Sequence, residues 1–172
     1  MEIISCDTSH LPTIMAIFNE AILHTTALWE YKPRTLETIT VWFEAKSKGG
    51  YPVIGIVNDA GALTGFASYG VFRNWPGYKY TVEHSVYVDA RFRGKGIGTQ
   101  LMKELIRIAQ SQNVHTIIGA IDTANEASRA LHRSLGFEHC GTIKQAGFKF
   151  GRWLDMVFYQ LILPTPTHPI DG

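Results

Sequence analysis

The spacing of apolar residues divides the chain into segments with two different periods. Between residues 82 and 88 valine or histidine stands at every second position, and this alternation predicts a half-buried strand. Its predicted inner face consists of Val82, His84, Val86 and Val88. After residue 96 apolar residues recur at the spacing of an amphipathic helix, at Ile97, Leu101, Leu105, Ile108 and Ala109. The junction at residues 89–98 therefore joins a strand to a helix.

The N-terminal part predicts a strand at residues 2–6 followed by two helices. Ser9 is the predicted N-cap of the first helix. The apolar stripe of this helix consists of Leu11, Ile14, Ile17, Phe18, Ala21 and Ile22. The second helix is predicted to begin after Thr35, another capping residue, and to end at Gly49 and Gly50.

The remaining extended segments predict a sheet of mixed direction. They lie at residues 52–57, 62–72, 79–89, 115–121, 139–148 and 153–163. The turn at residues 58–61 joins the first two as an antiparallel hairpin. A helix at about residues 96–113 connects 79–89 to 115–121, which implies a parallel pair. With a further helix at 124–135, the expected fold class is α/β (α+β), with a mostly antiparallel sheet, a central parallel pair and flanking helices.

Chain length and the composition of the last residues set the expected domain organisation. A chain of 172 residues is long enough to bury about 70% of its unfolded surface in one core. We therefore expect a single domain over residues 1–163. Three prolines between Pro164 and Pro169 prevent regular strand pairing, so residues 164–172 are predicted to form a disordered tail.

Composition and charge argue against several classes of function. Hydrophobic residues make up 45% of the chain and charged residues 18%, as in ordinary globular proteins, and the formal net charge is +1. This charge argues against nucleic acid or another partner recognised through bulk charge. The first residues lack a basic region and a long apolar run, so we expect no signal peptide and no membrane anchor. Cys6 and Cys140 fit no metal motif or disulfide framework, which predicts reduced, largely buried thiols in a cytoplasmic protein.

The junction at residues 89–98 has the composition of an anion-binding loop. Glycines let the backbone turn with its amides directed inward, and the N-terminus of the following helix carries partial positive charge. The loop contains Arg91, Arg93, Gly94, Lys95, Gly96 and Gly98, whose spacing fits neither a Walker loop nor a dinucleotide fingerprint. A phosphate or pyrophosphate is the expected ligand. The alternative is a glycine-rich turn with a solvated basic rim.

Two motifs in this order resemble the GCN5-related N-acetyltransferase (GNAT) superfamily. Residues 93–98 are similar to its pattern Arg/Gln-x-x-Gly-x-Gly/Ala, and residues 125–137 to Asn-x-x-(Ala/Ser)-x-x-Leu-(Tyr/His)-x-x-x-Gly-Phe. Alone, the second segment is better explained as a core-packing helix that ends at Gly136. The resemblance implies a single-domain GNAT fold and acetyl-CoA as co-substrate, with no metal. The cofactor-binding residues that it implies are Val86, Tyr87, Val88, Arg93, Gly94, Lys95, Gly96, Ile97, Gly98, Asn125 and Ser128.

Shorter segments resemble the phosphinothricin and methionine sulfoximine acetyltransferases in particular. They lie at residues 69–73, 80–88, 131–132 and 151–155, and the resemblance covers residues 2–163. It implies acetyl transfer to the α-amine of phosphinothricin, methionine sulfoximine or methionine sulfone, and with it detoxification and herbicide resistance. The chain departs from these relatives at residues 74–78, where many have a second arginine and an alanine. Trp153 and the final strand are candidates for contact with a second copy, so a homodimer is expected.

Acetyl transfer to an amine needs a base, and Glu83 is the candidate. An amino-acid ammonium must lose a proton before its nitrogen can attack a thioester. Glu83 lies on the strand that leads to the loop, in phase with Ser85 and Tyr87 and opposite the predicted inner face. The alternative is a surface carboxylate paired with Lys79. Backbone N–H groups near Tyr87 or Val88 would stabilise the developing oxyanion.

His132 occupies the position at which most relatives have a tyrosine. It would protonate the departing thiolate or orient the sulfur, and the alternative is a structural histidine on an apolar helix face. Neither cysteine lies in a matched motif, which argues for direct transfer without a covalent acetyl-enzyme.

A substrate oxyanion needs a cation, and Arg73 is the first candidate. Its planar guanidinium matches a phosphinate or carboxylate in two hydrogen bonds, and Lys79, Lys149 and Arg152 are the reserves. Aromatic walls for the pocket are available in Trp29, Tyr31, Phe72 and Trp75, although each alone is better explained as core. The predicted substrate-binding residues are Arg73, Trp75, Tyr31 and Glu83.

Two other functions remain open from the sequence. The acceptor could be another amine, such as a protein N-terminus, a polyamine or an aminoglycoside, although the basic, aromatic segment 73–79 does not suit a polycation. A non-catalytic acyl-CoA-binding module would keep the loop and need no base. Glu83 discriminates between these classes.

Overall fold

The structure, a computed structural model, describes residues 1–171, and the chain folds into two compact units. The first consists of Met1–Tyr69 and Ser85–Leu105, and the second of Gly70–His84 and residues 106–171. Strand β4 and helix α3 each run from one unit into the other, with bounds Thr81–Val88 and Ile97–Ser111.

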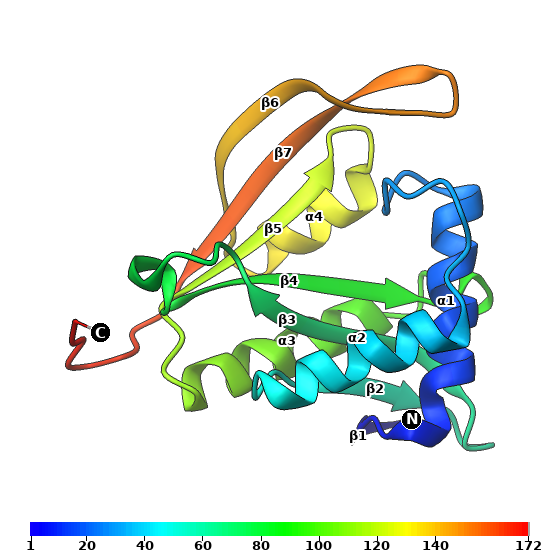
Figure 1. The fold of residues 1–172 in the computed structure, drawn as a ribbon, viewed down its shortest axis with the longest axis horizontal. Coiled ribbons are helices and arrows are strands. Elements are labelled where there is room, and N and C mark those ends of the chain that lie inside the picture. Colours follow the sequence, from blue (N-terminus) through cyan, green and yellow to red (C-terminus); the bar gives the residue numbers. More distant parts are fainter. Residues whose placement is uncertain (172) are drawn as a thin grey trace. The chain divides into compact units, whose positions relative to one another are not determined.

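Within the described chain, seven strands hydrogen-bond in the order β1-β2-β3-β4-β5-β7-β6 (Figure 1). Besides β4 they are β1 (Glu2–Ser5), β2 (Val53–Val57), β3 (Leu63–Val71), β5 (Thr116–Asp122), β6 (Glu138–Lys149) and β7 (Arg152–Ile162). Strands β4 and β5 pair parallel, whereas β1–β2, β2–β3, β5–β7 and β6–β7 pair antiparallel. The predicted mixed sheet with a parallel pair is confirmed.

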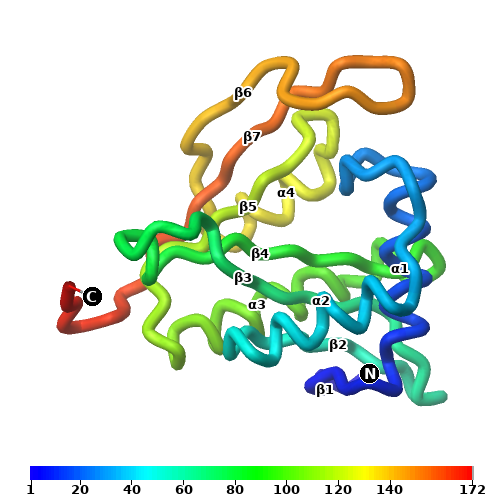
Figure 2. Tube along the Cα trace, in the orientation of Figure 1, coloured from blue at the N-terminus to red at the C-terminus, as the bar shows by residue number. Residues whose placement is uncertain are grey.

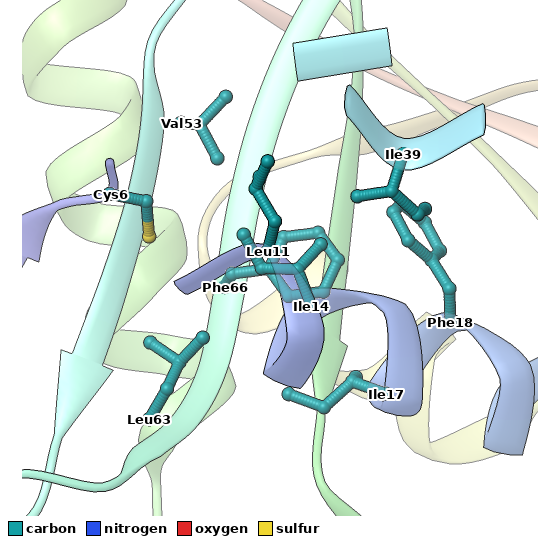
Figure 3. Close-up of a cluster of buried hydrophobic side chains, with 9 residues drawn as sticks. All are labelled: Cys6, Leu11, Ile14, Ile17, Phe18, Ile39, Val53, Leu63 and Phe66. Carbon is teal, nitrogen blue, oxygen red and sulfur yellow. The ribbon is translucent and has the colours of Figure 1, made fainter. Parts of the chain in front are cut away.

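An apolar cluster joins the helices and strands of the first unit. The helices are α1 (Leu11–His24) and α2 (Leu36–Lys48). The cluster comprises Cys6, Leu11, Ile14, Ile17, Phe18, Ile39, Val53, Leu63 and Phe66 (Figure 3). The centre of the Phe18 ring lies 5.3 Å from that of Trp42, 4.9 Å from that of Phe66 and 5.0 Å from that of Tyr87. All residues of the predicted α1 stripe are buried, which confirms the helical pattern.

The two predicted helix caps had different outcomes. Thr35 accepts the backbone N–H of Thr38 and caps α2, as predicted. The prediction for Ser9 was wrong, because the carboxylate of Asp7 accepts the Ser9 N–H at 2.9 Å and starts a short 3-10 turn. That turn delays α1 until Leu11, and Pro12 suits the first turn because a helix needs no N–H there.

The second unit contains a long hairpin and a short helix. Strands β6 and β7 form this hairpin (Figure 2). The chain turns at Phe150 and Gly151, both at positive φ, and β6 is exposed along most of its length. Helix α4 (Glu126–Ser134) ends just before Gly136, whose φ is +83°, as predicted. Within residues 1–171 no helix is both long and apolar enough to cross a membrane.

The two cysteines differ in exposure. Cys6 is buried in the apolar cluster, as predicted, and both thiols are free. The prediction of burial was wrong for Cys140, which is exposed on β6. That strand stands last in the sheet order, so it has a strand neighbour on one side only.

The C-terminal segment contacts the second unit without regular structure. The carbonyl oxygen of Thr165 lies 2.7 Å from Nδ1 of His115, and the Ile170 N–H donates to the Tyr80 hydroxyl at 3.2 Å. Disorder of residues 164–172 stays a prediction, and its last residue, Gly172, lies outside the described residues.

Candidate active site

In the first unit, the loop after β4 is anchored by Asp89. Its backbone N–H donates to the carbonyl oxygen of Thr64 on β3 at 3.0 Å. Its carboxylate accepts the N–H of Arg91 at 2.9 Å and caps the 3-10 turn Ala90–Phe92. The predicted junction of strand, loop and helix is therefore confirmed.

Glycines determine the path of this loop. Gly94 and Gly96 have φ values of +76° and +77°, where side chains are strained, and an added Cβ at either would meet no atom within 4 Å. The backbone conformation, rather than packing, therefore favours glycine at both positions. Sequence analysis missed Gly65 of β3, where a Cβ would lie only 2.9 Å from the carbonyl oxygen of Tyr87. Gly65 lets β3 approach the end of β4.

Arg91 and Lys95 make their contacts inside the loop. Arg91 pairs with Asp89 at 2.7 Å, and its hydrogen bonds lower the pKa of that carboxyl group. The Lys95 ammonium lies 5.1 Å from the centre of the Phe92 ring. In the described part of the chain no carboxylate lies within ion-pair distance of Lys95, so its charge can meet an anion.

Arg93, a predicted phosphate ligand, forms an ion pair with Glu20 of α1. Its Nε also donates to the carbonyl oxygen of Val88 at 3.1 Å. Because the carboxylate competes with a phosphate for the guanidinium, binding through Arg93 would require this pair to exchange. Sequence analysis missed Glu20, which lies 73 positions from Arg93.

In the second unit, the pairing of β4 with β5 ends at the candidate base. The register stops at Glu83, opposite Ile118, although both strands continue. Glu83 is exposed, whereas its neighbours Val82 and His84 are buried, as the predicted alternation requires. The catalytic role of Glu83 stays a prediction.

Directly after this point, His84 of β4 and His132 of α4 form a buried pair. Their Nε2 atoms are 2.8 Å apart, and the side chains are 8% and 1% exposed. Nδ1 of His132 lies 2.6 Å from the carbonyl oxygen of Ser128. Burial, with a smaller contribution from His132, lowers the pKa of His84 to about 3. Burial also lowers the pKa of His132, against the opposing effect of its bond to Ser128.

Gly119 of β5 makes room for the two imidazoles. An added Cβ would lie 2.7 Å from Nε2 of His132 and 2.8 Å from Nε2 of His84. Alanine would therefore displace at least one ring. Sequence analysis proposed a role for His132 alone, because the requirement for His84 and Gly119 arises only when three separate elements meet.

Asn125 caps α4 by accepting the N–H of Ser128 at 3.1 Å. This capping role leaves the N–H groups of the Asn125 side-chain amide able to make further hydrogen bonds. Cofactor binding by Asn125 and Ser128 stays a prediction.

The predicted substrate-binding residues are exposed. Tyr31 is 71% and Trp75 73% exposed, and the Arg73 guanidinium lies 5.1 Å from the centre of the Phe72 ring. Arg73 and Trp75 belong to the second unit with Glu83, and Tyr31 to the first. Of the reserve cations, Lys149 is 3% exposed.

The two thiols both have raised pKa values. Burial raises the pKa of Cys6 to about 12, and partial desolvation raises the pKa of the exposed Cys140, so the thiolate form of each is disfavoured. Among residues 1–171 no group of three or more His, Cys, Asp or Glu side chains could hold a metal ion.

Comparison with known proteins finds an acetyltransferase family and acetyltransferase relatives. Residues 14–137 match the Acetyltransferase (GNAT) family. A relative from Pseudomonas paraeruginosa, named L-methionine sulfoximine/L-methionine sulfone acetyltransferase, is 48% identical over 160 residues, which are 92% of this chain and 93% of the relative.

Solved structures match over nearly the whole chain. Ribosomal-protein-alanine N-acetyltransferase from Brucella melitensis is 45% identical, with a TM-score of 0.93 over 95% of this chain and 100% of that one. A GNAT superfamily phosphinothricin acetyltransferase from Sinorhizobium meliloti, solved with acetyl-CoA, is 34% identical, with a TM-score of 0.94 over 98% of this chain and 91% of that one.

Proposed function

The chain belongs to the Acetyltransferase (GNAT) family and is an acetyl-CoA-dependent N-acetyltransferase, and we propose that its acceptor is the α-amine of a small amino acid with tetrahedral acceptor oxygens. Phosphinothricin, methionine sulfoximine and methionine sulfone are the candidate substrates. The names of the Pseudomonas and Sinorhizobium relatives support this choice. Acetylation of such inhibitors would amount to detoxification, and for phosphinothricin to herbicide resistance.

The observation that carries the proposal is the exposed carboxylate of Glu83 at the end of the β4–β5 register. It stands six positions before Asp89, which opens the glycine loop. A base and an anion-binding loop are the two parts that acetyl transfer from CoA to an ammonium needs. A non-catalytic acyl-CoA module would need only the second.

The reaction then proceeds by direct transfer. Glu83 takes a proton from the ammonium, directly or through water, and the neutral amine attacks the thioester carbonyl. Backbone N–H groups near Tyr87 or Val88 stabilise the oxyanion. His132 is the proposed source of the proton that the departing thiolate gains. The raised pKa values of the thiols support a mechanism without an acetyl-cysteine.

Arg73 is the proposed anchor for the substrate oxygens. A guanidinium can donate two hydrogen bonds to a phosphinate, sulfoximine or sulfone group. The exposed Trp75 beside it in the sequence would shield this contact from water.

Steady-state kinetics on a matched substrate series tests this assignment. Methionine sulfone and methionine sulfoximine should be acetylated, and methionine, which lacks the sulfone oxygens, should have a much lower kcat/KM. Arg73→Ala should raise KM for the sulfone by the equivalent of about 1.5–3 kcal/mol of charged hydrogen bonding. Lys48→Ala, which removes an 82%-exposed cation of α2, is the control and should leave KM unchanged.

The rival acceptor is a protein N-terminus, and the name of the Brucella relative favours it. A short peptide with an N-terminal alanine therefore belongs in the same series. A kcat/KM for the peptide above that for methionine sulfone, or equal values for methionine and its sulfone, would defeat the substrate assignment and leave acetyl transfer standing.

The proposed setting is a cytoplasmic homodimer without nucleic-acid or membrane partners. Large apolar side chains are exposed on and beside the β6–β7 hairpin, at Ile143, Phe148, Phe150, Trp153 and Ile162. An exposed apolar edge favours contact with a second copy. Sedimentation equilibrium should give twice the mass of the chain, and a single-chain mass at micromolar concentration would contradict the dimer.

A further inference from the structure

The buried pair of His84 and His132 contains one nitrogen that the protein leaves unpaired. Nδ1 of His84 is buried and has no hydrogen-bond partner among the described residues. A buried acceptor without a hydrogen bond destabilises the fold, so its retention points to a ligand or a proton that it meets during function.

We propose that His84 and His132 form a proton relay whose unpaired end is Nδ1 of His84, and that the relay carries a proton from the acceptor nitrogen to the leaving sulfur. The inference rests on the proposed function and adds His84 to its machinery.

The hydrogen bonds fix the protonation state of the resting pair. The carbonyl oxygen of Ser128 can only accept, so Nδ1 of His132 carries a proton and donates it. In the neutral ring Nε2 of His132 is then an acceptor, and the facing Nε2 of His84 must be the donor. Nδ1 of His84 is therefore bare. Any proton that His132 supplies to sulfur therefore passes through His84, the ring of the pair that has an unpaired nitrogen.

The pair lies next to the point at which β4 stops pairing with β5. His84 follows Glu83, and Gly119 follows Ile118, at the last residue pair of the β4–β5 register. The close approach of both Nε2 atoms to Gly119 shows that β5 lacks a side chain at the position that the rings occupy. The relay is thus held between β4, β5 and α4, and His84 directly follows the proposed base in the sequence, with its side chain on the other face of β4.

The protons that the reaction releases and consumes define what the relay would do. Conversion of an ammonium to an amide removes two protons from nitrogen, and the thiolate gains one. Glu83 takes the first. The second N–H bond breaks as a bond to Nδ1 of His84 forms, directly or through water, while the Nε2 proton of His84 moves to Nε2 of His132. Return along the same path delivers the proton to sulfur and restores two neutral rings.

The residues around the two imidazole rings favour only brief binding of an extra proton by the pair. Tyr159 of β7 lies with its ring centre 5.9 Å from that of His132, and Arg129 and Arg133 of α4 lower the pKa of Tyr159. His139 of β6 packs against the same tyrosine, and Glu83 points to the opposite face of β4. Within the described chain no carboxylate forms an ion pair with either ring. The lowered pKa of His84 suits a residue that passes a proton on.

His84→Gln separates a relay from simple positioning. Glutamine can still donate an amide N–H to His132, but it does not take up a proton at neutral pH. The relay predicts that kcat for methionine sulfone falls about 10-fold or more, while Kd for acetyl-CoA stays within about 2-fold. His24→Gln removes an exposed histidine in the last turn of α1 and should change neither quantity.

Nitrogen NMR of the wild-type protein tests the resting state without a variant. We expect His84 protonated on Nε2 and His132 on Nδ1. A His84→Gln protein with wild-type kcat, or a resting His84 protonated on Nδ1, overturns the relay. If the wild type transfers no acetyl group, the proposed function fails; if wild type and His84→Gln are equally active, the relay alone fails. Should the variant not fold, the NMR result decides.

Discussion

At the scale of single residues, the two buried histidines link stability to pH. Burial lowers the pKa of both in the folded protein, that of His84 to about 3. Unfolded histidine has a pKa of about 6.5, so between about pH 3 and 6.5 the unfolded chain binds more protons. The free energy of unfolding therefore rises with pH across this range, and the folded protein loses this stability on acidification.

Chemical denaturation at pH values between about 5 and 6.5 measures this linkage. In that window most carboxylates stay ionised, and the slope contributed by His84 should approach about 1.4 kcal/mol per pH unit at its acidic end. His84→Gln should flatten the dependence, and His24→Gln should not. Parallel curves for wild type and His84→Gln would show that His84 does not carry the linkage.

A residue's role could be predicted from the sequence when the interaction that requires it joins residues close together in the chain. The exposure of Glu83 followed from strand alternation, and the cap at Thr35 from residues three positions apart. Gly65 and Gly119 are required by close approaches between different elements, and Glu20 by an ion pair far along the chain. No local pattern contains such information.

At the scale of elements, the glycine loop makes a sharp prediction about acetyl-CoA. Gly96 and Gly61 have nearly equal φ values, +77° and +75°, and an added Cβ meets no atom within 4 Å at either. Valine should therefore strain the backbone similarly at both positions. Only at Gly96 should it also obstruct a pyrophosphate at the loop amides.

Calorimetric titration with acetyl-CoA distinguishes these effects. Gly96→Val should weaken binding by about 10-fold or more, whereas Gly61→Val, in the β2–β3 turn, should lose comparable stability and keep its affinity. A folded Gly96→Val protein with unchanged affinity would remove the loop from the binding site.

At the scale of the whole molecule, the mixed direction of the sheet was predictable, and its full strand order and the details of its edges were not. Apolar periodicity and the rule for strand–helix–strand connections led to the parallel β4–β5 pair inside an otherwise antiparallel arrangement. The exposure of Cys140 escaped prediction because it depends on β6 standing last in the sheet. The Asp7 cap escaped because Ser9 is an equally good capping residue by type.

Product analysis with acetyl-CoA labelled in its acetyl group tests the central claim most directly. With methionine sulfone, the account predicts one labelled N-acetyl product for each CoA released and no label on the protein. Glu83→Gln should lower this rate by about 10²-fold, with the remaining rate rising with pH as free amine accumulates. Labelled acetate alone, a labelled acetyl-enzyme, or near wild-type turnover by Glu83→Gln at neutral pH would contradict it.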